Sequence, residues 1–268
     1  ALSNSEDWRV IIPRRSVLYM PGSNARALEK ARSLPADCLL FDLEDSVAPE
    51  EKALAREQVV AAVQAGGYAP REVVIRINAL SSPWGAEDLR AAASSAADGL
   101  LLPKVDGPET LAEARAMLAL WAMMETPLAI IRANEIAAAA AAERNPLTVF
   151  VMGTNDLAKE TRAALAPGRT PMLTWLSTCV LAARAYGLEI IDGVFNDFAD
   201  DAGFAAECEQ GRELGMDGKT LIHPRQIAPC NLAFSPSADE VERAREIIAA
   251  FDKPENAGKG AISINGRM

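Results

Sequence analysis

Short and almost continuously apolar runs recur along the chain, and each run is followed by a turn and a stretch with helical signals. The runs do not alternate between apolar and polar residues, which is typical of strands buried on both faces, as in a parallel sheet. We therefore predict eight strands, at residues 16–20, 38–43, 73–77, 99–102, 120–124, 148–152, 188–194 and 219–222.

Helix signals lie between the predicted strands. Proline at a helix start, carboxylates in the first turn and glycine after the last turn mark most of these segments. The expected helices lie at residues 49–66, from 108 onward, at 137–142, 170–187 and 201–215. This α/β order predicts a (β/α)8 TIM barrel, although a doubly wound open sheet would have the same periodicity. A dinucleotide site is disfavoured because no Gly-x-Gly-x-x-Gly follows the first strand.

The composition changes after the eighth strand. Ser237 and Glu240 form a capping-box pattern before a helix at 241–251, and a glycine-rich tail follows. Ile262 and Ile264 alternate in this tail, which predicts a short strand or hairpin. We expect residues 14–230 to form the barrel and residues 231–268 to form a C-terminal extension involved in subunit contacts.

Composition narrows the functional classes. The 268 residues carry a net charge of −10, so nothing predicts binding to duplex nucleic acid or to an anionic membrane. One histidine and four scattered cysteines argue against zinc sites and His-based triads. The sequence has neither a membrane-spanning apolar run nor a signal-peptide pattern. We expect a cytoplasmic protein with buried free thiols, whose catalysis uses carboxylates, Arg or Lys.

In a barrel of this type, chemistry gathers at the carboxyl ends of the strands. The predicted strand ends carry acidic groups, one arginine and one lysine, namely Asp42, Glu44, Asp45, Arg76, Lys104, Glu125 and Asp156. Glu125 and Asp156 follow adjacent strands and have the oxygen ligands that Mg²⁺ prefers. Arg76 is a candidate for a two-pronged hydrogen bond to a substrate carboxylate.

Structural roles compete with these assignments. Glu125 or Asp156 could cap a helix or form an ion pair, and at least one of the three carboxylates at 42, 44 and 45 is expected to do so. Lys104 is a candidate either for a Schiff base or for an ion pair. The Pro-Gly-Ser turn after the first strand, with Arg15 and Lys30 nearby, could hold a phosphorylated ligand.

Seven motifs occur in an order that resembles a known family. They are Arg15-Ser-Val-Leu-Tyr-Met-Pro-Gly, Phe41-Asp-Leu-Glu-Asp-Ser-Val, Ile75-Arg-Ile-Asn, Leu102-Pro-Lys, Glu125-Thr-Pro, Gly153-Thr-Asn-Asp-Leu and Ile222-His-Pro. Together they resemble the citrate lyase β-subunit-like branch of the aldolase/citrate lyase family, which includes malyl-CoA and citramalyl-CoA lyases. The resemblance runs from about Arg14 to the end of the chain.

The resemblance implies a homo-oligomeric barrel, a trimer or hexamer, with Mg²⁺ on Glu125 and Asp156. It places the substrate-carboxylate arginine at Arg76 and gives Arg15 and Lys30 a role in binding coenzyme A. The implied reaction splits a malyl- or citramalyl-type CoA thioester into acetyl-CoA and a 2-oxo acid, glyoxylate or pyruvate. In such lyases an Asp of the C-terminal segment is the general acid. Here it is expected beyond Met268 and stays unassigned.

Three other functions remain open. The chain could be a citrate lyase β subunit that produces oxaloacetate and works with an acyl carrier protein. It could be a Schiff-base aldolase that uses Lys104, or a non-catalytic barrel that binds acyl-CoA. The oxo acid itself is not fixed, because glyoxylate and pyruvate differ by one methyl group, worth about 1–3 kcal/mol in a pocket.

Overall fold

Eight parallel strands close into a barrel in the computed structural model, which describes residues 12–114, 118–141, 146–264 and 266. Each strand pairs with the next one, and β1 pairs with β8. The strands are β1 (Ser16–Pro21), β2 (Cys38–Asp42), β3 (Glu72–Arg76), β4 (Gly99–Leu102), β5 (Ala119–Met124), β6 (Leu147–Met152), β7 (Glu189–Asp192) and β8 (Gly218–Leu221). Closure confirms the predicted barrel and excludes the open sheet.

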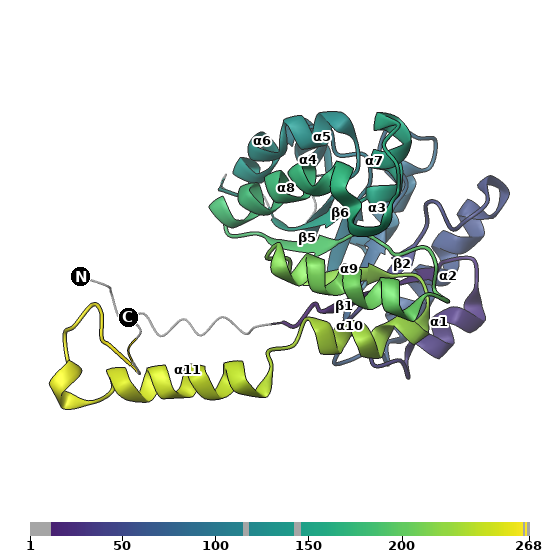
Figure 1. Ribbon diagram of the computed structural model, residues 1–268. Helices are drawn as coiled ribbons and strands as arrows, with labels where there is room; N and C mark the ends of the chain where they lie inside the picture. Colours follow the sequence, from purple (N-terminus) through teal and green to yellow (C-terminus); the bar gives the residue numbers. More distant parts are fainter. Residues whose placement is uncertain (1–11, 115–117, 142–145, 265, 267–268) are drawn as a thin grey trace. The chain divides into compact units, whose positions relative to one another are not determined.

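Helices surround the strands on the outside of the barrel (Figure 1). The α-helices of this part are α1 (Ala25–Ala31), α2 (Lys52–Ala65), α3 (Gly85–Ala93), α4 (Pro108–Ala114), α5 (Pro127–Ile131), α6 (Ala133–Ala138), α7 (Thr154–Thr161), α8 (Leu173–Ala185), α9 (Asp201–Glu213) and α10 (Ile227–Ala233). Short 3₁₀ helices are η1 (Pro49–Glu51), η2 (Ala139–Ala141), η3 (Pro167–Met172) and η4 (Pro224–Gln226). The predicted helix at 170–187 begins only at Leu173, because the residues up to Met172 form η3, where Pro171 donates no backbone hydrogen bond.

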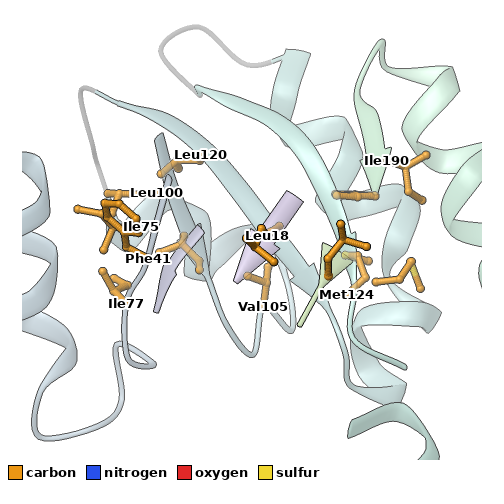
Figure 2. Close-up of a cluster of buried hydrophobic side chains, with 14 of the residues drawn as sticks. Leu18, Phe41, Ile75, Ile77, Leu100, Val105, Leu120, Met124 and Ile190 are labelled. Atoms are coloured by element: carbon orange, nitrogen blue, oxygen red, sulfur yellow. The ribbon is translucent and has the colours of Figure 1, made fainter. Parts of the chain in front are cut away.

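The absence of alternation in the strands has a direct structural cause. Neighbouring residues of a strand face opposite sides of the sheet, and both sides are buried here. Val17 packs inside the barrel, whereas Leu18 belongs to the layer between the strands and the helices. Figure 2 shows residues of this outer layer, contributed by several strands. All four cysteines are buried free thiols, as the composition predicted.

The chain divides into two units, Ala1–Phe234 and Ser235–Met268. The expected boundary at residue 230 falls inside α10, whose Cys230 is buried and contacts the backbone oxygen of Arg15. The second unit contains α11 (Ala238–Phe251), which begins with the predicted capping box, and η5 (Pro254–Asn256). The expected strand in the tail is wrong for the described residues, where only Ile264 forms a bridge.

Candidate active site at the barrel mouth

The carboxyl ends of the strands and the loops that follow them form the barrel mouth, which surrounds a cavity of about 300 Å³. Parallel pairing explains why distant residues meet there, since Asp42 and Arg76 are direct neighbours in the register of β2 and β3. The predicted site residues that line the cavity are Asp42, Asp45, Arg76, Glu125 and Asp156. The structure therefore brings together the arginine and the two carboxylates expected to hold a metal.

Glu125 and Asp156 converge on a single cation, the ammonium group of Lys104. Nζ of Lys104 lies 3.7 Å from Oε1 of Glu125 and donates a hydrogen bond to Asp156. The backbone N–H of Lys104 also donates to Oε1 of Glu125 at 2.7 Å, and a positive φ of 52° at Lys104 accompanies this contact. The two carboxylates thus already share a positive charge.

The protonation of these groups follows from their surroundings. Burial raises the pKa of Glu125, and the positive charge of Lys104 opposes this effect only in part. Burial lowers the pKa of Lys104, but the hydrogen bond to Asp156 and the nearby carboxylate charges outweigh it, so the net pKa is raised. Lys104 is therefore held as an ammonium ion, which argues against the Schiff-base aldolase, because that chemistry needs a neutral amine.

These residues fit a hard divalent cation. Two carboxylates that already meet at one cation have the oxygen donors that Mg²⁺ uses, with water and substrate oxygens completing its shell. Gly153 leaves room beside them, since a Cβ atom there would lie 2.9 Å from Oε2 of Glu125. Within the described residues, no group of three or more His, Cys, Asp or Glu side chains forms a metal cage. The geometry suits an ion that keeps several non-protein ligands.

Arg76, which lines the same cavity, is buried and paired with several carboxylates. Its Nε and Nη2 donate to the two oxygens of Asp42, each at 2.7 Å. Burial alone would raise the pKa of Asp42, but the Arg76 charge and the hydrogen bonds to Asp42 hold it below the ordinary value. The ring of Tyr19 lies 4.8 Å from the guanidinium carbon of Arg76. Arg76 is therefore fixed in one orientation.

Glu44 and Asp45 face the remaining nitrogen of Arg76. Oε2 of Glu44 lies 3.0 Å from Nη1, and Oδ2 of Asp45 lies 3.6 Å from it. Burial raises the pKa of Glu44 to about 7, although Arg76 opposes the increase. The end of β2 therefore supplies one structural carboxylate, Asp42, and the loop after β2 supplies two, Glu44 and Asp45, that compete for the same guanidinium nitrogen.

The expectation for Arg15 is corrected by its position. Arg15 precedes β1 and so lies at the amino-terminal end of the barrel, opposite the mouth, where its Nε donates to Asp37 at 2.8 Å. The side chain of Asp37, immediately before β2, also accepts from the backbone N–H of Arg15. Lys30 is exposed in the last turn of α1 and does not line the mouth cavity. Neither residue joins the group around Arg76 and Glu125.

Sequence reasoning missed several polar and aromatic groups of the cavity. Tyr19 lies within a predicted strand, and the alternation of inward and outward residues along that strand could have placed it beside Arg76. Asn155, in the first turn of α7, and Asn196, in the loop after β7, exchange amide hydrogen bonds of 3.1 and 2.8 Å, and both line the cavity. No local sequence signal indicates this pair, because its members are 41 positions apart.

The family model of the HpcH/HpaI aldolase/citrate lyase family matches residues 15–224. The chain belongs to this family. This HpcH/HpaI aldolase/citrate lyase family member is 49% identical to a (3S)-malyl-CoA thioesterase of Cereibacter sphaeroides over 259 residues, which cover 96% of this chain and 89% of the relative. It is 37% identical to the citrate lyase subunit beta of Escherichia coli, with 100% and 92% of the two chains covered.

Solved structures resemble this family member as well. One is the citrate lyase beta subunit of M. tuberculosis complexed with oxaloacetate and magnesium, with a TM-score of 0.73, 30% identity and coverage of 84% and 98%. Another is protein CitE of Mycobacterium tuberculosis in complex with magnesium, acetoacetate and coenzyme A, with a TM-score of 0.76, 29% identity and coverage of 94% and 90%. The family resemblance read from the seven motifs is confirmed, and the family is one of enzymes.

Proposed function

We propose that this protein is a Mg²⁺-dependent carbon–carbon lyase that acts on a malyl- or citramalyl-type CoA thioester and yields acetyl-CoA and a 2-oxo acid. The observation that carries the proposal is the convergence of Glu125, Asp156 and Arg76 on one cavity at the barrel mouth. Similar structures whose complexes contain magnesium with oxaloacetate or with coenzyme A support the same assignment.

The roles of the residues follow from their charges and positions. Glu125 and Asp156 would hold Mg²⁺, which supplies a Lewis acid at the oxygen where charge develops during carbon–carbon cleavage. Arg76 would bind the carboxylate of the oxo-acid portion and orient it. Asp42 and Tyr19 fix the guanidinium before substrate arrives, so little reorganisation is needed when the negative charge builds up.

Of the two residues that the sequence indicated for coenzyme A binding, we keep one in the proposed site. Lys30 remains a candidate, because it is an exposed cation on α1, the helix that follows the Pro-Gly-Ser turn after β1. Arg15 is left out, since its guanidinium is paired with Asp37 at the other end of the barrel. The catalytic acid, expected beyond Met268, lies outside the described residues and stays unassigned. The structure describes Gly266 but not residues 265, 267 and 268.

Hydrolysis of the thioester is a second candidate function. The identity of 49% to a (3S)-malyl-CoA thioesterase over nearly the whole chain favours it. Both reactions would use the same cation and the same carboxylate-binding arginine, and they differ in whether the carbon–carbon bond or the thioester bond breaks. Their products separate them, because cleavage yields acetyl-CoA with glyoxylate, whereas hydrolysis yields malate with free CoA.

A product assay tests both candidates. The protein is incubated with malyl-CoA or citramalyl-CoA, with Mg²⁺ or with EDTA, and the products are separated by chromatography. The lyase proposal expects Mg²⁺-dependent acetyl-CoA and oxo acid in equal amounts. Malate and CoA without oxo acid would reject the lyase in favour of the thioesterase. Unchanged turnover in EDTA would reject the metal-dependent mechanism.

Two further alternatives have their own controls. A citrate lyase subunit should show almost no turnover of free acyl-CoA. It should turn over citryl thioester when an acyl carrier protein is added. A Schiff-base aldolase should form a covalent adduct on Lys104 when pyruvate and borohydride are present. We expect no such adduct, because the ammonium group of Lys104 is held in its protonated form.

A further inference from the structure

The hydrogen-bonding capacity of Arg76 is unequally divided. The fork formed by Nε and Nη2, which usually grips a carboxylate with two parallel hydrogen bonds, is already filled by Asp42. Nη1 points to Glu44 and Asp45 instead. An incoming carboxylate therefore cannot use the fork unless it displaces Asp42, which also accepts hydrogen bonds from the backbone of residues 44 and 46. A ligand carboxylate can replace the partners of Nη1 at a smaller free-energy cost than it can replace Asp42.

Glu44 is held close to that nitrogen by its own backbone. Its N–H donates to Oδ1 of Asp42 at 2.9 Å, and its carbonyl oxygen accepts from Nζ of Lys52 at 2.7 Å. The Glu44 side chain is only 15% exposed, whereas that of Asp45 is 69% exposed. Asp45 can therefore rotate into solvent when a ligand arrives. Glu44 remains in the buried mouth beside any new negative charge.

The charges around Glu44 make the binding of a second anion beside it unfavourable. Arg76 from β3 and Lys104 from the loop after β4 are the cations whose charges act with Glu44. The anionic or titratable groups around Glu44 are the carboxylates of Asp42 at the end of β2, of Asp45 in the loop of Glu44 and of Glu125 after β5, together with the phenol of Tyr19 from β1. A ligand carboxylate on Nη1 would add a negative charge next to Glu44 and remove its closest cationic partner.

We propose that Glu44 is the resident counterion of Nη1 of Arg76, that an incoming carboxylate replaces it there, and that Glu44 takes up a proton from solvent in the exchange. Glu44 thus couples the binding of a ligand carboxylate at Nη1 to the uptake of a proton. The inference rests on the proposed function, since it takes Arg76 to be the residue that binds the carboxylate of the oxo acid.

The sign of the expected pH dependence follows directly. Without ligand or metal the pKa of Glu44 is about 7, so much of the carboxyl is ionised at pH 7.5 and must be protonated on binding. Affinity for a 2-oxo acid should therefore fall as the pH rises above 7. If the ligand binds only when Glu44 is neutral, the loss between pH 7 and pH 8 is about fivefold.

Isothermal titration calorimetry with pyruvate tests the proposal on the full chain. Saturating Mg²⁺ is present throughout, so that protons released by metal binding are not counted. Titrations at pH 7.5 in two buffers of different ionisation enthalpy give the number of protons bound with each pyruvate. For the unmodified protein we expect an uptake of about half a proton or more. Glu44→Gln should abolish the uptake and bind pyruvate at least as tightly at pH 8.

A matched variant and a clear set of outcomes complete the test. Glu50→Gln removes an exposed carboxylate at the start of η1 and should leave the proton uptake unchanged. The proposal is overturned if the unmodified protein binds pyruvate without proton uptake, or if Glu44→Gln weakens binding. If Glu44→Gln does not fold by circular dichroism, the proton count of the unmodified protein decides. If pyruvate shows no Mg²⁺-dependent binding, the proposed function fails together with the inference.

Discussion

At the scale of single residues, the mouth contains more carboxylates than cations. Five acidic side chains, Asp42, Glu44, Asp45, Glu125 and Asp156, face two cationic side chains, Arg76 and Lys104. Carboxylates this close raise one another's pKa unless positive charge compensates them. The raised pKa of Glu125 and of Glu44 indicates that this compensation is incomplete. A divalent cation between Glu125 and Asp156 would supply the missing charge.

Removing one of the two proposed metal ligands should abolish Mg²⁺-dependent turnover. Glu125→Gln and Asp156→Asn keep the shape of the side chain but lose the charge that attracts the ion, so we expect activity to fall about 100-fold or more. Mg²⁺ titrations of the reaction rate measure this effect. Glu160→Gln, an exposed carboxylate at the end of α7, is the control and should remain near the unmodified rate. Full activity in either ligand variant would contradict the metal assignment.

The raised pKa of Glu44 also predicts a pH-dependent stability difference. Folding raises this pKa from 4.5 to about 7, so ionisation of Glu44 disfavours the folded state. The resulting penalty is absent below about pH 4.5, grows as the pH rises, and is complete above about pH 7. Glu44→Gln escapes this penalty. Urea unfolding at pH 5 and pH 8 should show the variant gaining on the order of 1–3 kcal/mol relative to the unmodified protein at the higher pH. An equal difference at both pH values would contradict the assignment.

At the scale of elements, a buried ionic cluster joins β7, β8, α9 and η3 on the outer side of the barrel wall. Asp192 accepts from Nη1 of Arg169 at 2.6 Å and from Nζ of Lys219 at 3.1 Å. Lys219 also donates to Glu207 of α9. Burial alone would raise the pKa of Asp192, but its two cationic partners hold it below the ordinary value. This cluster fixes the end of β7, which leads into the cavity-lining loop at Val194.

Breaking this cluster should destabilise the barrel strongly. Asp192→Asn removes the fully buried carboxylate that pairs with Arg169 and Lys219 and leaves them with Glu207 as their shared anion, and we expect a loss of about 3–5 kcal/mol in the free energy of unfolding. Asp201→Asn removes an exposed partner of Arg225 and should cost about 0–1 kcal/mol. Urea denaturation of both variants at neutral pH gives the comparison. Similar small losses for the two would show that the buried cluster adds little stability.

At the scale of the whole molecule, the proposed site and the C-terminal unit belong to different compact parts. The residues that line the mouth cavity lie in the unit that ends at Phe234. The other unit contains α11, which exposes apolar side chains at Ile247, Ile248 and Phe251. None of the described helices is long and apolar enough to cross a membrane. We propose that the second unit makes contacts between subunits of a homo-oligomer.

Truncation after Phe234 separates binding from assembly. The shortened chain keeps Arg76, Glu125 and Asp156, so its Mg²⁺-dependent affinity for pyruvate should stay within about threefold, a change of less than 1 kcal/mol. Its mass by light scattering should drop to that of a monomer, whereas the full chain should be a trimer or hexamer. Loss of pyruvate binding would show that the C-terminal unit completes the site. An unchanged oligomer would assign the subunit contacts to the barrel.

Much of this architecture could be predicted from local patterns. The predicted strands agree with the observed ones within two residues at each end, because doubly buried strands leave long apolar runs in the sequence. Polar residues at the ends of these apolar runs also allowed Arg76, Glu125 and Asp156 to be predicted as site residues. The motif around the first strand did not reveal that Arg15 lies away from the mouth. Arg15 precedes β1, whereas the Pro-Gly-Ser turn of the same motif follows it.

The sequence by itself determined the strands, about half of the α-helices, the family and the residue types that gather at the mouth. Only the tertiary structure decided that the barrel closes and that Arg76 pairs with Asp42 and Glu44. It also decided that the ammonium group of Lys104 lies between Glu125 and Asp156. The physical reason is that apolar periodicity is a property of each segment alone. Charge compensation instead depends on which side chains from different strands come within a few ångströms of each other.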